Sequence, residues 1–233
     1  MRRTTAGVLG GQELVEARVT RADTHDPEIV VRVLEPLVTQ ARRTRLQEVI
    51  SRRLASVSVV LDRPYDPHNG AAVLRSCEAF GLERLHVVER GDTPFAVARS
   101  VARSAEKWID VICHPSADSC IAWARAAAMP LVATHPLGEL VPEELASMPR
   151  IALVLGNERD GIRTELVRAC SHGVRVPMRG FVESLNVSVT AAIVLQAVTR
   201  NRPGDLTPAV KRRLYARGLY LSIDRAEEIL ARA

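Results

Sequence analysis

Short apolar runs of strand length alternate with helix-length amphipathic segments through the middle of the chain. This alternation restricts the fold more than any other feature. β-Branched residues dominate the strand-like runs, which are predicted at 56–61, 85–89, 108–112, 130–134, 151–156 and 174–178. Between them, the spacing of apolar residues predicts helices at 70–80, 116–128, 164–170 and 184–200. Strands that alternate with helices in this way predict a parallel α/β sheet with helices on both faces.

The two ends of the chain depart from this pattern. Residues 1–25 are predicted to be irregular, and a helix that starts after Asp26 is expected to kink or split at Pro36. An amphipathic basic helix is predicted at 39–54, and two more helices follow a break at 201–204, near 207–217 and 222–232. We therefore expect three parts: an N-terminal basic helical extension at 1–54, an α/β domain at 55–200 and a C-terminal helical extension at 201–233.

The net charge of +5 is concentrated at the two ends. Residues 1–53 carry 10 arginines and 7 acids, residues 200–233 carry 8 basic residues and 4 acids, and the middle carries 14 basic residues and 16 acids. Basic ends around a nearly neutral middle predict a polyanionic partner, although solvated charge without a partner gives the same pattern. The basic residues proposed for this contact are Arg42, Arg43, Arg45, Arg52, Arg53, Lys211, Arg212 and Arg213.

Composition disfavours several other classes of protein. No apolar run approaches the length of about 18 residues that a transmembrane helix needs, and no signal-peptide core follows the first arginines, so we expect a cytoplasmic protein with no membrane partner. The four cysteines are scattered and the histidines lack metal-type spacing, which predicts reduced thiols and no metal site. No dinucleotide-binding glycine motif and no phosphate-binding P-loop are present.

Polar residues cluster in three segments where predicted strands end, and ligands bind at the carboxyl ends of parallel strands. In 62–81, Asn69 is placed to begin a helix and Arg75 lies opposite its apolar stripe. In 151–162, Gly156 directly follows a strand and Glu158 comes two residues later. In 174–195, a loop leads to Ser184 and Asn186, just before an apolar helix that must be buried or lie in an interface. Each polar residue taken singly also fits a purely structural role, as a cap or a turn.

As an ordered set, PHNGAAVLRSCEAFG, LVLGNERDGI and VPMRGFVESLNVSVTAA closely resemble the three motifs of the SpoU/TrmH family of RNA 2′-O-ribose methyltransferases. The resemblance covers roughly residues 40–200. It implies the SPOUT α/β fold with a C-terminal deep trefoil knot, and a homodimer whose site is completed across the interface. It also implies S-adenosylmethionine as methyl donor, with no metal.

The resemblance also implies roles for particular residues. Cofactor contacts fall by similarity on Thr134, Gly156, Val176, Met178 and Leu185. Arg75 takes the catalytic position, either as the base or as the group that orients the 2′-hydroxyl. The other polar positions of the family motifs fall on Asn69, Glu158, Ser184 and Asn186.

The N-terminal helix and the tail VKRRLYARGLY resemble the branch of the family that methylates guanosine 18 in the D-loop of tRNA. Ribosomal RNA or another tRNA position is the alternative substrate, and DNA is not expected. Two readings from other classes stay open: a non-catalytic RNA-binding factor on the same scaffold, and a small-molecule nucleotide-binding protein. The presence of Arg75 and of the 184–186 cluster counts against the first of these. The basic ends count against the second.

Overall fold

The computed structural model describes residues 4–5, 16–18, 21–89, 91, 95, 102, 104–157 and 159–233. These residues form two compact units. One contains 4–5, 16–18 and 55–202, and the other contains 21–54 together with 203–233. The two terminal segments, which the sequence sets at opposite ends of the α/β domain, therefore belong to a single helical unit.

The larger unit is built on a sheet whose described strands follow the order β1-β2-β5-β4-β3-β7-β6-β8. Six of them are mutually parallel: β3 (Val57–Asp62), β4 (Arg84–Val88), β5 (Asp110–His114), β6 (Leu131–Thr134), β7 (Ile151–Leu155) and β8 (His172–Val174). The predicted parallel α/β sheet is confirmed. Every residue of the adjacent strands β3 and β7 is buried, as their continuous apolar runs require.

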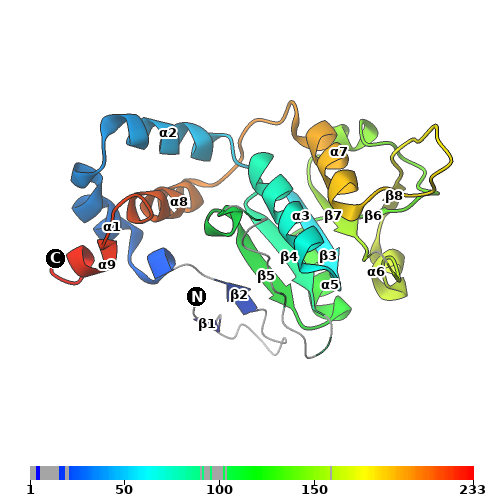
Figure 1. The fold of residues 1–233 in the computed structure, drawn as a ribbon, viewed down its shortest axis with the longest axis horizontal. Helices are drawn as coiled ribbons and strands as arrows, with labels where there is room; N and C mark the ends of the chain where they lie inside the picture. The colour runs from blue at the N-terminus through cyan, green and yellow to red at the C-terminus, as the bar shows by residue number, and fades with distance from the viewer. Residues whose placement is uncertain are drawn as a thin grey trace. The chain divides into compact units, whose positions relative to one another are not determined.

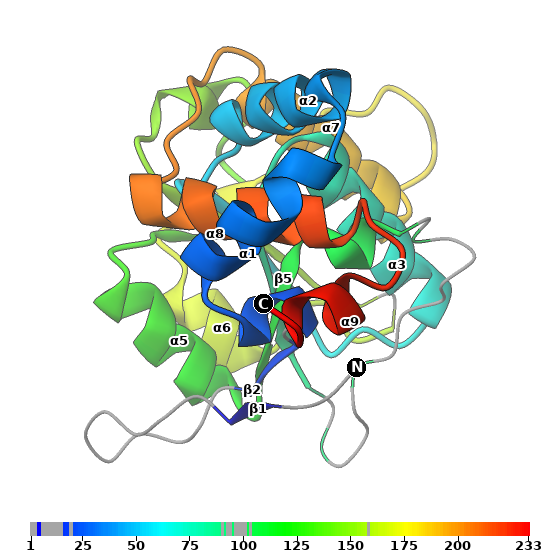
Figure 2. The same ribbon diagram turned by 90° about the vertical axis from the view of Figure 1, so that its left-hand side faces the viewer.

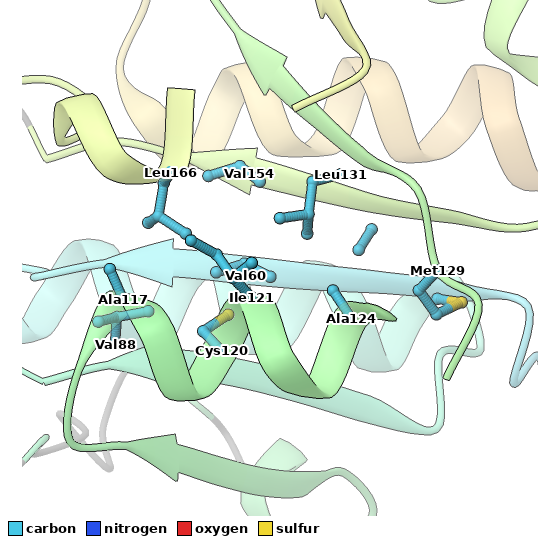
Figure 3. Packing of buried hydrophobic residues seen from close by; sticks show 11 residues of the cluster. Val60, Val88, Ala117, Cys120, Ile121, Ala124, Met129, Leu131, Val154 and Leu166 are labelled. Atoms are coloured by element: carbon cyan, nitrogen blue, oxygen red, sulfur yellow. The ribbon is translucent and has the colours of Figure 1, made fainter. Parts of the chain in front are cut away.

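Helices cover both faces of this sheet. α3 (Pro67–Ala79) and α7 (Val187–Thr199) pack together on one face, while α5 (Ala117–Ala126) and α6 (Thr164–Ala169) lie on the other (Figures 1 and 2). Short 3-10 turns, η3 (Ala105–Lys107) and η4 (Glu144–Ser147), complete the unit. α5 presents Cys120, Ile121 and Ala124 to the sheet (Figure 3).

Two short strands precede the helices. β1 (Thr4–Thr5) pairs with β2 (Glu16–Arg18), and β2 pairs with β5, in both cases antiparallel. The prediction that residues 1–25 are irregular is therefore wrong for these segments, and also for the 3-10 turn η1 (Arg21–Thr24). Without β2, β5 would be the edge of the sheet and would present a row of unpaired backbone groups, which a short segment of weak propensity can join.

The predicted starts of α3 and α7 are also wrong. α3 begins at Pro67, and the carboxylate of Asp66 caps it by accepting from the backbone N–H of His68 at 2.8 Å. Proline fits the first helical turn and aspartate is a strong cap, so this pair starts the helix ahead of Asn69. α7 begins at Val187 with Asn186 as its cap, three residues after the predicted start.

β8 ends at Val174, so the strand predicted at 174–178 is wrong beyond its first residue. The chain that leaves β6 passes from one edge of β8 to the other. On the β6 side, the N–H of His135 donates to Val174 O at 2.9 Å. On the opposite side, Leu140 N donates to Gly173 O at 3.0 Å and Arg175 N donates to Leu140 O at 2.9 Å. Residues 135–140, here called the arch, therefore cross over β8. The trefoil knot as a whole stays a prediction.

The second unit is helical. It comprises η1, α1 (Pro27–Leu34), η2 (Glu35–Leu37), α2 (Gln40–Ser51), α8 (Pro208–Tyr220) and α9 (Ala226–Leu230) (Figure 1). The predicted split at Pro36 is confirmed, because α1 ends at Leu34 and a 3-10 turn follows. Ion pairs join the two ends of the chain, notably between buried Arg217 and Asp23 at 2.9 Å. Across the described residues of both units, no helix combines the length and the apolarity that crossing a membrane requires.

Candidate functional site

A pocket of about 950 Å³ opens where β6, β7 and β8 end. The segments that follow these strands line it, together with the first residues of α7. Because parallel strands bring their carboxyl ends to one edge of the sheet, segments far apart in the sequence meet here. The lining contains every residue proposed for the cofactor, namely Thr134, Gly156, Val176, Met178 and Leu185.

Glycines let backbone segments of this wall approach closely. A Cβ at Gly156 would lie 2.3 Å from the carbonyl carbon of Gly161, and one at Gly138 would lie 2.5 Å from that of Val174. The turn after Gly156 is closed by Gly161 N, which donates to Asn157 O at 3.1 Å. The Asn157 side-chain oxygen accepts from the N–H groups of Arg159 and Asp160, at 2.9 and 2.8 Å. The pocket wall is therefore a shaped backbone surface that larger residues cannot reproduce.

Apolar and acidic groups share the lining. Leu155 and Val174 are buried apolar wall residues, whereas Glu139, Asp160 and Glu183 add carboxylates. Hydrogen bonds from its own N–H and from that of Gly173 hold the pKa of Glu139 below its ordinary value. Both carboxylate oxygens lie 3.0 Å from Gly173 N, so Glu139 also ties the arch to β8. Because Arg175 also lines the pocket, the lining suits a ligand with an apolar part and charged groups of both signs.

A pair of amide side chains joins the first and third motifs beside the pocket. The Nδ2 of Asn186 donates to Oδ1 of Asn69 at 3.0 Å. The Oδ1 of Asn186 accepts from the N–H and the hydroxyl of Ser188, at 2.8 and 2.6 Å. Ser184 and Asn186 both line the pocket. The structure thus brings three of the proposed catalytic residues, Asn69, Ser184 and Asn186, to one place.

Arg75 lies elsewhere on the same unit. It is exposed on α3, opposite the buried stripe of Val73, Leu74 and Cys77, as its helical position predicts. It is not among the described residues that line the pocket. Glu158, the remaining proposed catalytic residue, lies outside the described residues.

Sequence reasoning missed two contacts that join the loop after β3 to the loop after β7. The buried carboxylate of Asp62 accepts from the backbone N–H and from Nε of Arg163, both at 2.7 Å. The guanidinium of Arg159 lies 3.7 Å from the ring centroid of Tyr65. One signal for Asp62 was available, because a carboxylate that ends an otherwise apolar, buried strand needs a partner.

The basic residues proposed to contact a polyanion all lie in the helical unit, and they differ in availability. The predicted exposure of Arg53 is wrong: it is 3% exposed, because α2 ends at Ser51 and the chain turns inward to accept a hydrogen bond from Asp205 N. Arg212 forms a two-pronged pair with Glu28, at 2.8 and 2.6 Å, and Arg213 lies 3.7 Å from Asp23. The remaining proposed residues are exposed or half-buried: Arg42, Arg43, Arg45, Arg52 and Lys211.

The buried histidines and thiols lie away from the pocket mouth. His86 and His114 contact each other beneath α5, and Cys77, Cys113 and Cys120 are buried free thiols. Within the described residues, no group of histidine, cysteine and carboxylate side chains is arranged to hold a metal ion.

The sequence and the fold of this chain are both similar to those of known proteins. The model of the SpoU rRNA Methylase family matches residues 56–196. The chain is 32% identical to the tRNA (guanosine(18)-2′-O)-methyltransferase of Thermus thermophilus, over 70% of this chain and 84% of that protein. The fold resembles that of the A. aeolicus TrmH/SpoU tRNA modifying enzyme, with a TM-score of 0.70 and 24% identity over 80% of this chain and 98% of the other. It also resembles an AdoMet-bound rRNA methyltransferase from Sinorhizobium meliloti, with a TM-score of 0.56 and 28% identity over 66% of this chain and 59% of the other.

Proposed function

Because this chain belongs to the SpoU rRNA Methylase family, we propose that it transfers a methyl group from S-adenosylmethionine to a ribose 2′-hydroxyl of RNA. The observation that carries the proposal is the pocket at the ends of β6, β7 and β8. Its lining gathers all five expected cofactor positions, and the Asn69–Asn186 pair lies beside it.

The pocket fits S-adenosylmethionine by its chemistry. Buried apolar residues such as Leu155 and Val174 suit the flat adenine ring, while the carboxylates of Glu139, Asp160 and Glu183 suit the positive sulfonium and ammonium groups. Its volume is that of an ordinary small-molecule site. Thr134, Gly156, Val176, Met178 and Leu185 are the residues that would hold the molecule. When bound, it supplies an activated methyl group on a sulfonium centre.

The chain's own residues must position the ribose and remove its proton, since a hydroxyl is a weak nucleophile at neutral pH. Asn69 and Asn186 form a preorganised amide pair that can orient the ribose. Ser184 adds a hydroxyl at the same mouth. Arg75 is the proposed base or orienting group. In the second role its planar guanidinium would hold the neighbouring phosphate, which matches the geometry of that side chain.

Arg75 does not line the pocket of its own chain, so we propose that a second copy supplies it in a homodimer. α7 supports this arrangement. Its exposed side carries Val189 and Ile193, which are 46% and 38% exposed although the helix is apolar nearly throughout. An apolar helix face in contact with water is typical of an interaction site. Substitution of both residues by aspartate is expected to convert dimer to monomer in sedimentation and to abolish methyl transfer.

tRNA is the proposed substrate, with guanosine 18 of the D-loop as the target. The Thermus relative carries that activity in its name and aligns over most of its own length. Exposed arginines of the helical unit, such as Arg45 and Arg52, would contact RNA phosphates, and the enzyme would work in the cytoplasm. The second candidate is ribosomal RNA, because the Sinorhizobium structure is named an rRNA methyltransferase.

The test is transfer of labelled methyl from S-adenosylmethionine to unmodified tRNA transcript, followed by nuclease digestion and identification of the nucleoside. Label in 2′-O-methylguanosine from the D-loop is expected. Label in ribosomal RNA alone supports the second candidate. Cofactor binding without label in any RNA would instead identify a non-catalytic RNA-binding factor.

The role of Arg75 needs a matched comparison. Arg75→Ala is expected to abolish transfer while cofactor affinity stays at the wild-type value, because the side chain lies outside the pocket. Arg168→Ala, which removes an exposed arginine from α6, is the control. Equal turnover by the two variants would remove Arg75 from the mechanism.

A further inference from the structure

An exposed aromatic ring is stacked against a guanidinium between the loops that follow β3 and β7. The chain has only eight aromatic residues of the Phe, Tyr and Trp types, and the structure describes all of them. Two are exposed, Tyr65 at 46% and Phe181 at 107%. The guanidinium carbon of Arg159 lies 3.7 Å from the centroid of the Tyr65 ring, which is the geometry of a cation–π stack. No role assigned above uses this pair.

A buried contact joins the two loops that carry the stack. Tyr65 follows β3 and Arg159 follows β7, and these strands pair directly, with Leu61 opposite Leu155. The Asp62 carboxylate accepts from Arg163 through the backbone N–H and through Nε, both at 2.7 Å. One end of each loop is therefore clamped to the other. This clamp lies three residues from Tyr65 and four residues from Arg159, whose own side chains are exposed.

Both members of the stack are neighbours in the sequence of residues that form the site. Asn157 and Asp160, on either side of Arg159 in the sequence, line the pocket, whereas Arg159 does not. Arg159 therefore belongs to the loop that lines the pocket without itself being part of the lining. Tyr65 stands four residues before Asn69, whose amide oxygen accepts from Asn186. A nucleotide whose ribose reaches the Asn69–Asn186 pair would bring its own base, or an adjacent base, close to the ring.

We propose that the Tyr65–Arg159 stack binds a nucleobase of the RNA substrate, at the methylated nucleotide or directly beside it. This inference rests on the proposed function. Unpaired RNA bases bind by stacking on aromatic rings and on guanidinium planes, and such stacking contributes about 1–3 kcal/mol per base. Arginine also adds a positive charge that favours the adjoining phosphate. The stack would hold the unstacked nucleotide while the amide pair orients its ribose.

Steady-state kinetics on the full-length enzyme test the proposal. Tyr65→Ala is expected to raise KM for RNA by roughly 5- to 160-fold, the range that one stacked base supports, with an unchanged Kd for S-adenosylmethionine. Tyr65→Phe keeps the ring and is expected to restore most of the loss. Tyr65→Leu keeps apolar bulk without a ring and is not expected to restore the lost affinity for RNA. Arg159→Ala is expected to lie between Tyr65→Phe and Tyr65→Ala.

Abasic RNA identifies the partner of the ring. Transcripts that lack the base at the target nucleotide or at either neighbour are compared on wild type and Tyr65→Ala. At one of these three positions, removal of the base should weaken wild type but leave Tyr65→Ala unaffected. An equal loss for both proteins at all three positions would overturn the proposal. A shift of Tyr65→Ala from dimer to monomer in sedimentation would also overturn it, because the ring would then be a protein contact.

Failure of this inference can be distinguished from failure of the proposed function. If wild type methylates RNA and Tyr65→Ala matches its KM, only the stack is wrong. If wild type methylates no RNA, the proposed function is wrong. In that case the two proteins are compared by filter binding, which gives Kd values for intact and abasic transcripts. Equal Kd values for wild type and Tyr65→Ala would overturn the proposal that the stack binds a base.

Discussion

Asp62 shows how much depends on a single side chain at the end of a strand. Its carboxylate is buried, and Arg163, its partner, follows 101 residues later, at 2.7 Å. The contact joins the loops that carry the first two motifs. A buried charge of this kind is tolerated because the Arg163 guanidinium and a backbone N–H satisfy it, and Nε of Arg63 lies 3.5 Å away as a second positive group.

Asp62→Ala is expected to lower the free energy of unfolding by about 3–5 kcal/mol, because it leaves the guanidinium of Arg163 partly buried without its carboxylate. Urea denaturation of the full chain measures this. Asp118→Ala, which removes an exposed acid from α5, is the control and should shift stability by less than about 1 kcal/mol. The double variant Asp62→Ala/Arg163→Met should recover part of the loss. A wild-type midpoint for Asp62→Ala would contradict this account.

Among the elements, the arch over β8 tolerates little change. The chain crosses the strand so closely that a Cβ at Gly138 would lie 2.5 Å from backbone carbon of Val174. Backbone atoms cannot move aside to relieve a steric clash as the tip of a flexible side chain can. The arch also lines the pocket, so its shape and the cofactor site are coupled.

Gly138→Ala is accordingly expected to reduce affinity for S-adenosylmethionine by at least about 10-fold and to lower the urea midpoint, since the arch must shift away from β8. Calorimetric titration and denaturation measure the two effects. Gly180→Ala is the matched control, because nothing lies within 4 Å of a Cβ at that position. Equal affinities for the two variants would mean that the arch accommodates the methyl group without cost.

Another coupling between elements involves β4, β5 and α5. His86 Nδ1 lies 2.9 Å from His114 Nε2, and the Trp123 ring stacks on His86 with centroids 3.5 Å apart. Burial holds the pKa of His86 well below its ordinary value, with a further lowering from His114 and Arg84. Burial also lowers the pKa of His114 to about 4. Both rings are therefore neutral in the folded protein near neutral pH.

Acid is expected to destabilise the fold through this pair. In the unfolded chain a histidine takes up a proton near pH 6.5, whereas folded His114 does so only near pH 4, so protons favour the unfolded state between these values. Stability should be full above about pH 6.5 and should fall by about 3 kcal/mol from His114 alone as the pH reaches 4. Urea midpoints measured across this range test it. His114→Gln should flatten the dependence, whereas His135→Gln, on the exposed part of the arch, should preserve it.

At the scale of the whole molecule, the basic ends form one helical unit in which internal ion pairs satisfy part of the charge. Arg217 and Asp23 are both buried, and Arg212 is engaged by Glu28. The net charge of the two ends therefore overstates the number of basic side chains that can contact a polyanion. The adjacent pair Arg52 and Arg53 separates the two situations, because the first is exposed and the second is buried.

Arg52→Ala is expected to weaken tRNA binding and to reduce the slope of log affinity against log salt by about 1, because one phosphate contact is lost. Arg53→Ala is expected to lower the stability of the helical unit and to leave the salt slope unchanged. Filter binding between about 50 and 200 mM salt, combined with thermal unfolding, distinguishes the two. A reduced slope for Arg53→Ala would show that the buried side chain becomes exposed to bind RNA.

Local pattern was sufficient for the order and type of the main elements. The six parallel strands, the helix that exposes Arg75 and the split at Pro36 follow from apolar period and proline geometry, which act over a few residues. The pocket-lining residues followed from the family resemblance, and the convergence of the carboxyl ends of parallel strands explains why they meet at one edge.

Only the tertiary structure decided contacts between distant positions. Three contacts each join segments about 100 residues apart: Asp62 with Arg163, Tyr65 with Arg159, and Asn69 with Asn186. The spacing of apolar residues within one segment does not select one partner over another. The same holds for the arch that carries the chain across β8, and for Arg53, which the helical pattern places outside and the packed unit encloses. A local sequence pattern indicates which side chains are buried. Which residue each buried side chain contacts depends on how complete elements pack together.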